Sequence, residues 1–135
     1  MYKILDHEAD TTIRFFYNDF EELVISIIKS FQETILGRSE NLEWSNVEPF
    51  NSAVEAGISY KFFAIDLLNE MIFLMEEKDL LPVELRKIDL NENVRELQID
   101  YGKCLNVTNY NAIPKAATTN SGQISDKFFD ITLDL

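Results

Sequence analysis

Two long segments in which apolar residues recur every three or four positions constrain the fold more than any other feature of the sequence. The first predicts a helix over residues 19–36, with Asn18 as its N-cap and Glu21 completing a capping box. The second predicts a helix over residues 60–78 that follows the N-cap Ser59. The side chains of the second helix that we expect in the core are Phe63, Leu67, Met71 and Leu74.

Segments with β-branched, aromatic or alternating residues flank these helices and predict strands. They are residues 2–5, 11–17, 85–90, 94–101, 113–118 and 127–135. Residues 39–57 predict further strand segments, with a break at the turn-forming residues 49–52. Helices interleaved with such strands predict one α+β domain over residues 1–135, with the two main helices packed on antiparallel or mixed β-sheet. The order of the strands does not follow from the sequence.

The charge balance restricts the kind of partner. The chain has 24 acidic and 12 basic residues, which gives a formal net charge of -12. Binding to a phosphate backbone draws most of its affinity from lysine and arginine, so we expect no independent binding to nucleic acid. A role in RNA metabolism would therefore run through a protein partner, and strong acidity suits a cation site or a basic docking surface.

Cysteine and histidine are too scarce for several kinds of site. Cys104 is the only cysteine and His7 the only histidine, so the chain can form neither an intramolecular disulfide nor a zinc site with two imidazoles. We see no nucleophile placed beside His7. The N-terminal residues lack a hydrophobic leader region, and no run approaches membrane-spanning length, so we expect a cytoplasmic protein without a membrane anchor.

Carboxylates gather near both ends of the sequence. If residues 6–10 are extended, Asp6, Glu8 and Asp10 lie on one side, where solvent or a hard cation would relieve their repulsion. Near the other end, alternation places Asp130 and Asp134 on the face opposite the apolar residues of the last strand. Spacing alone favours simple solvation for these residues, and nothing in it shows that the two groups meet.

Four short motifs in a particular order resemble those of the archease family, and together they cover nearly the whole chain. Each motif is weakly specific alone, but the order is hard to produce by chance. The motifs are Asp6-His7-Glu8-Ala9-Asp10, Asp66-Leu67-Leu68-Asn69-Glu70, Lys115-Ala116-Ala117-Thr118 and Leu133-Asp134-Leu135.

This resemblance implies a compact archease-like α+β domain that binds a metal ion. The implied ligands are Asp10, Asp134 and a main-chain oxygen of Leu135, with Asp6 and Asp130 as second-tier candidates. Oxygen ligands suit a divalent cation, with Ca²⁺ as our first expectation and Mg²⁺ or Mn²⁺ as alternatives.

Lys115 matches the lysine of the third family motif, and it is a candidate for contact with a partner or a phosphate. The family motif continues with tyrosine and histidine, whereas this chain has Thr119 and Asn120. The contribution of that aromatic and imidazole pair is therefore missing from this match.

The resemblance implies a non-catalytic accessory protein that activates an RtcB-type RNA ligase in tRNA splicing and RNA repair. In that family the accessory protein promotes guanylylation of the ligase and its multiple turnover. An alternative is a chaperone-like protein-interaction module that requires no metal. A small metal-dependent hydrolase is a third hypothesis, which the single histidine and the lack of an evident substrate pocket make the weakest.

Overall fold

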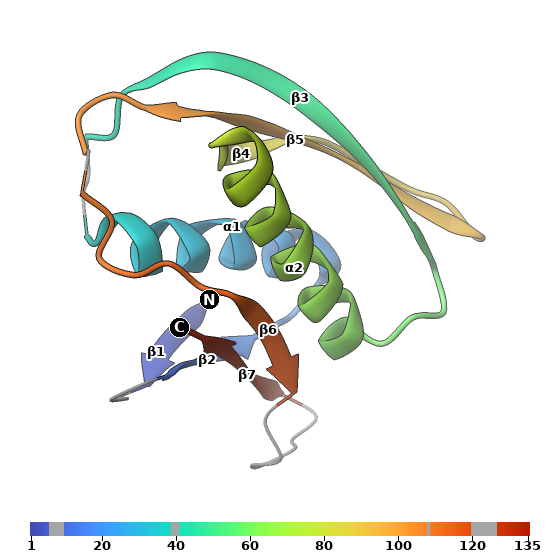
Figure 1. The fold of residues 1–135 in the computed structure, drawn as a ribbon. Helices are drawn as coiled ribbons and strands as arrows, with labels where there is room; N and C mark the ends of the chain where they lie inside the picture. The colour runs from blue at the N-terminus through green and yellow to red at the C-terminus, as the bar shows by residue number, and fades with distance from the viewer. Residues whose placement is uncertain (6–9, 39–40, 108, 120–126) are drawn as a thin grey trace.

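Nine helices and strands make up the part of the chain described by the computed structural model, which comprises residues 1–5, 10–38, 41–107, 109–119 and 127–135 (Figure 1). In chain order they are β1 (Tyr2–Leu5), β2 (Asp10–Phe16), α1 (Phe20–Leu36), β3 (Trp44–Glu55), α2 (Tyr60–Lys78), β4 (Leu81–Leu90), β5 (Val94–Cys104), β6 (Ala116–Thr119) and β7 (Phe128–Asp134).

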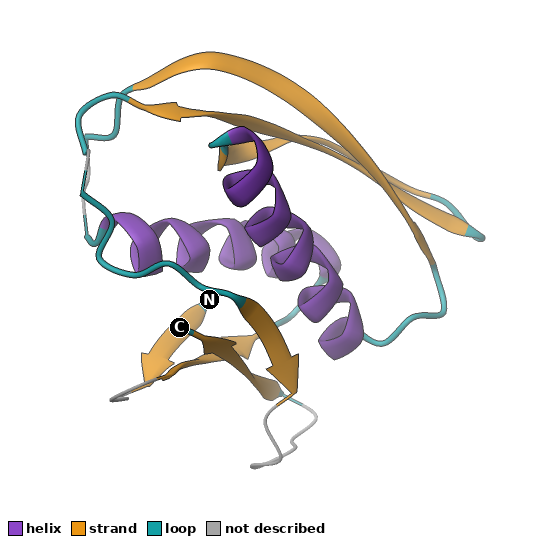
Figure 2. Cartoon of the chain, in the orientation of Figure 1, coloured by secondary structure: helices purple, strands orange, loops and turns teal. Residues whose placement is uncertain are grey.

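The strands form two antiparallel sheets with the helices between them (Figure 2). The four-stranded sheet has the order β1-β2-β7-β6, and the three-stranded sheet has the order β3-β5-β4. This arrangement confirms the predicted α+β class. In the four-stranded sheet, the first two strands of the chain lie beside the last two, so residues near both ends of the sequence share one sheet.

Helix α1 begins one residue later than its predicted cap would place it. Asp19, rather than Asn18, is the N-cap, and its side chain accepts a hydrogen bond from the main-chain N–H of Glu22 at 2.7 Å. Asn18 instead donates to the Glu22 side chain at 3.2 Å. The Asn18 prediction was wrong because both residues are good caps and only the backbone geometry distinguishes them.

Helix α2 has the predicted bounds and the predicted cap. The Ser59 hydroxyl accepts from the main-chain N–H of Phe62 at 3.2 Å. At the other end Asp79 adopts a left-handed conformation, and its N–H bonds back to the last turn. The four side chains expected in the core are buried: Phe63, Leu67, Met71 and Leu74.

Strand β3 is continuous where a break was expected. The predicted break at residues 49–52 was wrong, because the irregularity lies between Ser45 and Glu48, where Asn46 has a φ of 53°. Pro49 continues the strand because β3 is at the edge of its sheet, where a missing N–H can face away from the neighbouring strand.

The last strand shows the predicted division of faces. Phe129, Ile131 and Leu133 of β7 are buried against the helices, which leaves the alternate residues on the outward face of the four-stranded sheet. No helix in the described ranges is long and apolar enough to span a membrane.

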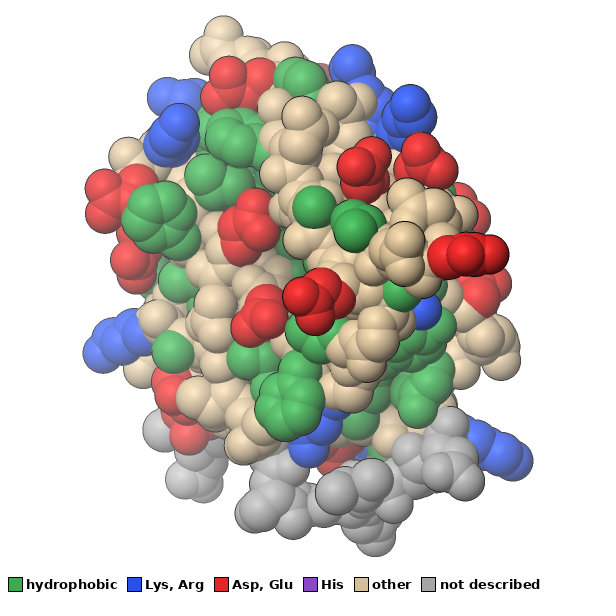
Figure 3. Space-filling model, turned by 90° about the vertical axis from the view of Figure 1, so that its right-hand side faces the viewer, with side chains coloured by type: hydrophobic (Ala, Val, Ile, Leu, Met, Phe, Trp, Pro, Cys, Tyr) green, Lys and Arg blue, Asp and Glu red, His purple; other side chains and the backbone are tan. Residues whose placement is uncertain are grey.

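Acidic and hydrophobic side chains share one exposed side of the molecule. Figure 3 shows this side, at the right of Figure 1, where β3 leads into α2. Carboxylates lie among hydrophobic groups near its centre, whereas lysines and arginines lie mainly at its margins.

Candidate functional site

The outward face of the β2–β7 ladder brings chemically matched residues opposite one another. Phe16 pairs with Phe128, and their rings are 5.9 Å apart. Two positions along, Arg14 pairs with Asp130. The next outward pair is Thr12 and Thr132, whose hydroxyls are 3.4 Å apart. The row therefore runs from an aromatic pair through an ion pair to a hydroxyl pair.

Asp130 forms a bidentate ion pair with Arg14. The Nε atom of Arg14 donates to Oδ1 at 2.8 Å, and Nη2 donates to Oδ2 at 3.0 Å. The Asp130 side chain is 7% exposed, and the guanidinium also lies 4.2 Å from the centre of the Phe128 ring. The hydrogen bond to Asp130 raises the pKa of Arg14. Both carboxylate oxygens of Asp130, a second-tier candidate for metal binding, therefore already accept a hydrogen bond from Arg14. A role for Asp130 as a metal ligand stays a prediction.

The row ends with Asp10 directly opposite Asp134. Cα atoms of opposed residues in an antiparallel ladder are about 4.5–5.5 Å apart, which places the two side chains within reach of a common ligand. Asp10 is exposed and Asp134 is partly exposed. Among the described residues, no lysine or arginine nitrogen lies within 4.0 Å of either carboxylate. Like charges in this position repel each other, and no lysine or arginine of the described chain neutralises them.

Lys115 lies next to this pair through its main chain. Its N–H donates to the main-chain oxygen of Asp134 at 2.6 Å, and the following residue, Ala116, pairs with Asp134 across β6 and β7. Lys115 is exposed. The third family motif and the last one are therefore adjacent in space, as a shared site requires.

Asn69 holds this region in place, and sequence reasoning missed its role. Its side-chain nitrogen donates to the main-chain oxygen of Ala117 at 3.2 Å, and its oxygen accepts from the Ala117 N–H at 2.8 Å. Helix α2 thereby bonds to strand β6 beside the aspartate pair. The only signal in the sequence was that Asn69 belongs to the second family motif, since its partner is 48 positions away.

The carboxylates of Asp10 and Asp134 carry oxygen atoms of the kind that a hard cation prefers. Within the described ranges no three His, Cys, Asp or Glu side chains gather around one point, so Asp10 and Asp134 would need main-chain oxygens, water or further residues to complete a coordination shell. Leu135 directly follows Asp134 and is partly exposed, which is compatible with ligation by its main-chain oxygen. Asp6 lies outside the described residues. The exposed Asp10 and the partly exposed Asp134, which no described lysine or arginine neutralises, fit a divalent cation.

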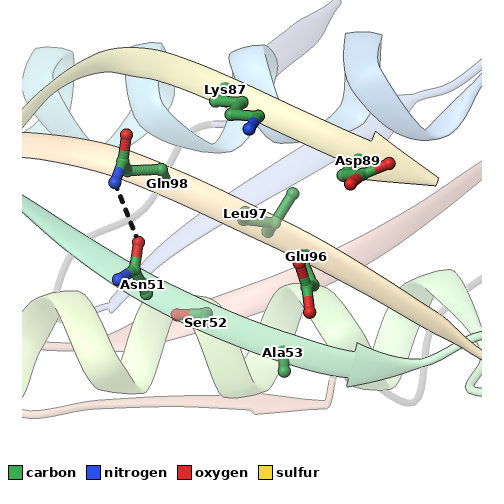
Figure 4. A pocket seen from close by; sticks show the side chains of 8 residues that line it. All are labelled: Asn51, Ser52, Ala53, Lys87, Asp89, Glu96, Leu97 and Gln98. Carbon is green, nitrogen blue, oxygen red and sulfur yellow. Dashed lines mark hydrogen bonds between the residues drawn. The ribbon is translucent and has the colours of Figure 1, made fainter.

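A second pair of opposed carboxylates lies on the other sheet. Asp89 of β4 is opposite Glu96 of β5, in a hollow of about 370 Å³ on the outer face of the three-stranded sheet (Figure 4). Lys87 lines the same hollow, and Gln98 donates to Asn51 at 3.0 Å beside it. A lysine therefore accompanies this pair, and none of its residues belongs to the family motifs, which makes Asp89 a useful control.

Comparisons with known proteins agree with the fold described above. A family model described as the archease protein family (MTH1598/TM1083) matches residues 2–133. Among solved structures, the solution structure of protein 1598 from Methanobacterium thermoautotrophicum is similar with a TM-score of 0.71 and 18% sequence identity, covering 99% of this chain and 98% of that one. No curated protein matches the sequence. Because the family model extends over nearly all of the sequence, the chain belongs to the archease family.

Proposed function

We propose that this protein is a non-catalytic accessory factor that activates an RtcB-type RNA ligase in tRNA splicing and RNA repair. Membership in the archease family supports an accessory role in tRNA splicing at the level of the family. The ligase as partner, stimulation of its guanylylation and turnover, and action in the cytoplasm are the finer parts of the proposal. The net charge of -12 favours a protein partner over direct binding to RNA.

The observation that carries the proposal is the juxtaposition of Asp10 and Asp134 without a neutralising cation from the described chain. In the proposed site these two carboxylates and the main-chain oxygen of Leu135 hold a divalent cation, with Ca²⁺ first and Mg²⁺ or Mn²⁺ as alternatives. A bound ion would supply positive charge between the two carboxylates. Lys115, exposed beside Asp134, would contact a phosphate or a carboxylate of the ligase.

A reconstituted ligation assay tests this function. Guanylylated ligase and joined RNA would be measured with and without the wild-type protein, and with Asp10→Asn, Asp134→Asn and Lys115→Ala at equal concentration. We expect stimulation by the wild type, loss of most of it in both aspartate variants, and no joining of RNA by this protein alone.

The matched control is Asp89→Asn, which removes one charge from the opposed carboxylate pair on the other sheet. This variant should stimulate the ligase like the wild type. A wild-type protein without effect on the ligase, or full stimulation by both site variants, would refute the proposal. Suppression of aggregation without stimulation would favour the chaperone-like alternative.

A further inference from the structure

The free edge of β3 is a second region with main-chain groups that could pair with another strand, and it belongs to a different sheet from the aspartate pair. Among the described strands, β3 pairs with β5 on one side and has no neighbour on the other. An edge strand offers main-chain N–H and C=O groups to any extended segment that comes alongside. The available stretch is limited at one end by the irregularity at residues 45–48 and by Pro49, which has no N–H to donate.

One hydrogen bond shows which main-chain groups of β3 point to β5 and which point to the free edge. The N–H of Ala56 donates to the main-chain oxygen of Asn93, at the start of the β3–β5 ladder. Register is regular from Glu48 to Glu55, and successive residues alternate between facing the partner strand and facing away. The N–H and C=O groups of Asn51 and Ala53 therefore point to the free edge.

A groove of about 520 Å³ runs along this edge and separates it from α2. Four consecutive strand residues, 52–55, line it. Because consecutive residues point to opposite faces of a sheet, a groove that all four line must follow the edge of the strand. The buried side chains of Phe63 and Leu67 form an apolar floor on the helix side.

The charge of the groove has one sign. Glu55, Asp66 and Glu70 line it, and none of the described lysines or arginines does. The Glu70 carboxylate accepts from the Ser52 hydroxyl at 3.2 Å, while burial raises the pKa of Glu70. Two phenylalanines of α2, Phe62 and Phe73, are more than half exposed on the same helix. The side of the molecule in Figure 3 shows the same mixture of acidic and hydrophobic groups.

We propose that an extended, basic segment of a partner protein adds to β3 as a further strand, over residues 51–55, and fills the groove above α2. Main-chain hydrogen bonds to Asn51 and Ala53 would provide affinity, and lysine or arginine side chains of the segment would pair with Asp66 and Glu70. The aliphatic stems of the same lysine or arginine side chains would contact the apolar floor, because the floor and the two carboxylates belong to the same helix. This inference does not depend on the metal site or on the ligase as partner.

The probe is a fluorescein-labelled octapeptide of alternating lysine and valine, with an alternating glutamate and valine peptide for comparison. Fluorescence anisotropy in buffer with chelator separates this binding from any cation effect at Asp10 and Asp134. We expect the lysine peptide to bind one site and the glutamate peptide not to bind. Amide signals of Asn51 and Ala53 in an NMR titration should shift on addition of the lysine peptide.

Two variants test the two parts of the contact. Ala53→Pro removes an edge N–H that has no role within the sheet and should weaken binding about tenfold, whereas Ala53→Val keeps the N–H and should bind as the wild type does. The double variant Asp66→Asn/Glu70→Gln leaves the strand intact and should weaken binding about fivefold, with Glu77→Gln as the control outside the groove.

Several outcomes would overturn the proposal. They are no binding of the lysine peptide up to about 1 mM, equal binding of the glutamate peptide, or unchanged binding in both the proline and the double variant. A dimer in sedimentation experiments that Ala53→Pro dissociates would show that the edge pairs with a second copy of this chain, and would also overturn it. Loss of ligase stimulation in the groove variants is not required, so the two proposals fail independently.

Discussion

The two ends of the β2–β7 ladder place an aspartate of the same strand in opposite electrostatic surroundings. Asp130 meets Arg14 in a bidentate pair that is mostly shielded from water. Asp134, four residues later, meets another carboxylate, that of Asp10. Opposite charges in the first arrangement attract each other across the two strands, whereas like charges in the second repel each other. We therefore expect the Asp130 end to stabilise the sheet, and we propose that the Asp134 end binds a ligand.

The largest expected effect comes from removing the ion pair between Arg14 and Asp130. Asp130→Ala would leave the Arg14 guanidinium without its carboxylate, and we expect a loss of about 2–3 kcal/mol in the free energy of unfolding, discounted because Arg14 is partly exposed. Urea denaturation measures the loss. Asp134→Ala, on the same face of the same strand, is the control and should change stability much less in chelator. Equal losses in the two variants would contradict the comparison.

Adding a divalent cation should stabilise the protein through the pair Asp10 and Asp134. At a free cation concentration about 100 times the dissociation constant, binding to the folded state stabilises it by about 2.7 kcal/mol. Thermal unfolding of the wild type should therefore shift upward with Ca²⁺, Mg²⁺ or Mn²⁺ relative to chelator. Asp10→Asn should abolish the shift, and Asp89→Asn should retain it. A shift of the same size in Asp10→Asn would place the ion elsewhere.

The hydrogen bonds from Asn69 of α2 to Ala117 of β6 should affect both stability and cation binding at the aspartate pair. Asn69→Ala removes both hydrogen bonds to Ala117, and we expect a loss of about 1–2 kcal/mol together with weaker cation binding. Asn51→Ala, which removes one exposed hydrogen bond with Gln98, is the matched control and should affect neither quantity strongly. Calorimetric titration with Ca²⁺ measures the affinity. If Asn69→Ala binds the ion as well as the wild type, the helix does not position the site.

The smallest expected effect is a gain, not a loss, in the free energy of unfolding. In chelator, Asp134→Asn removes the repulsion with Asp10, and we expect a gain of up to about 0.5 kcal/mol in the free energy of unfolding. High salt screens exposed charges, so the gain should shrink as potassium chloride is added. A loss of stability in chelator at low salt would mean that the Asp134 carboxylate has a stabilising partner.

Local features could be predicted from the sequence because their causes are local. The bounds of α2 follow from the Ser59 cap and the apolar period, and the buried face of β7 follows from alternation. The sequence could not decide between Asn18 and Asp19 as the cap of α1, because both residue types cap helices well. Only the backbone angles identify Asp19 as the cap. Pro49 was misread for a related reason, since proline breaks a central strand but not an edge strand.

Pairings between distant residues could not be predicted from spacing. Asn69 and Ala117 are 48 positions apart, and Arg14 and Asp130 are 116 apart. Nothing in the local pattern of either residue identifies its partner. Asp10 and Asp134 were expected together only because of the family resemblance, and their register in one ladder is what the structure adds.

The long separation along the chain also has a consequence for folding kinetics. The β2–β7 ladder closes a loop of more than 100 residues, as the Thr12–Thr132 contact across 120 positions illustrates. Such non-local pairings raise contact order and form late, because the entropy of loop closure must be lost before they contribute. A ligand shared by Asp10 and Asp134 would bind only after this closure. Ion affinity would then report on completed folding, and destabilising changes far from the aspartates would lower it without altering either carboxylate.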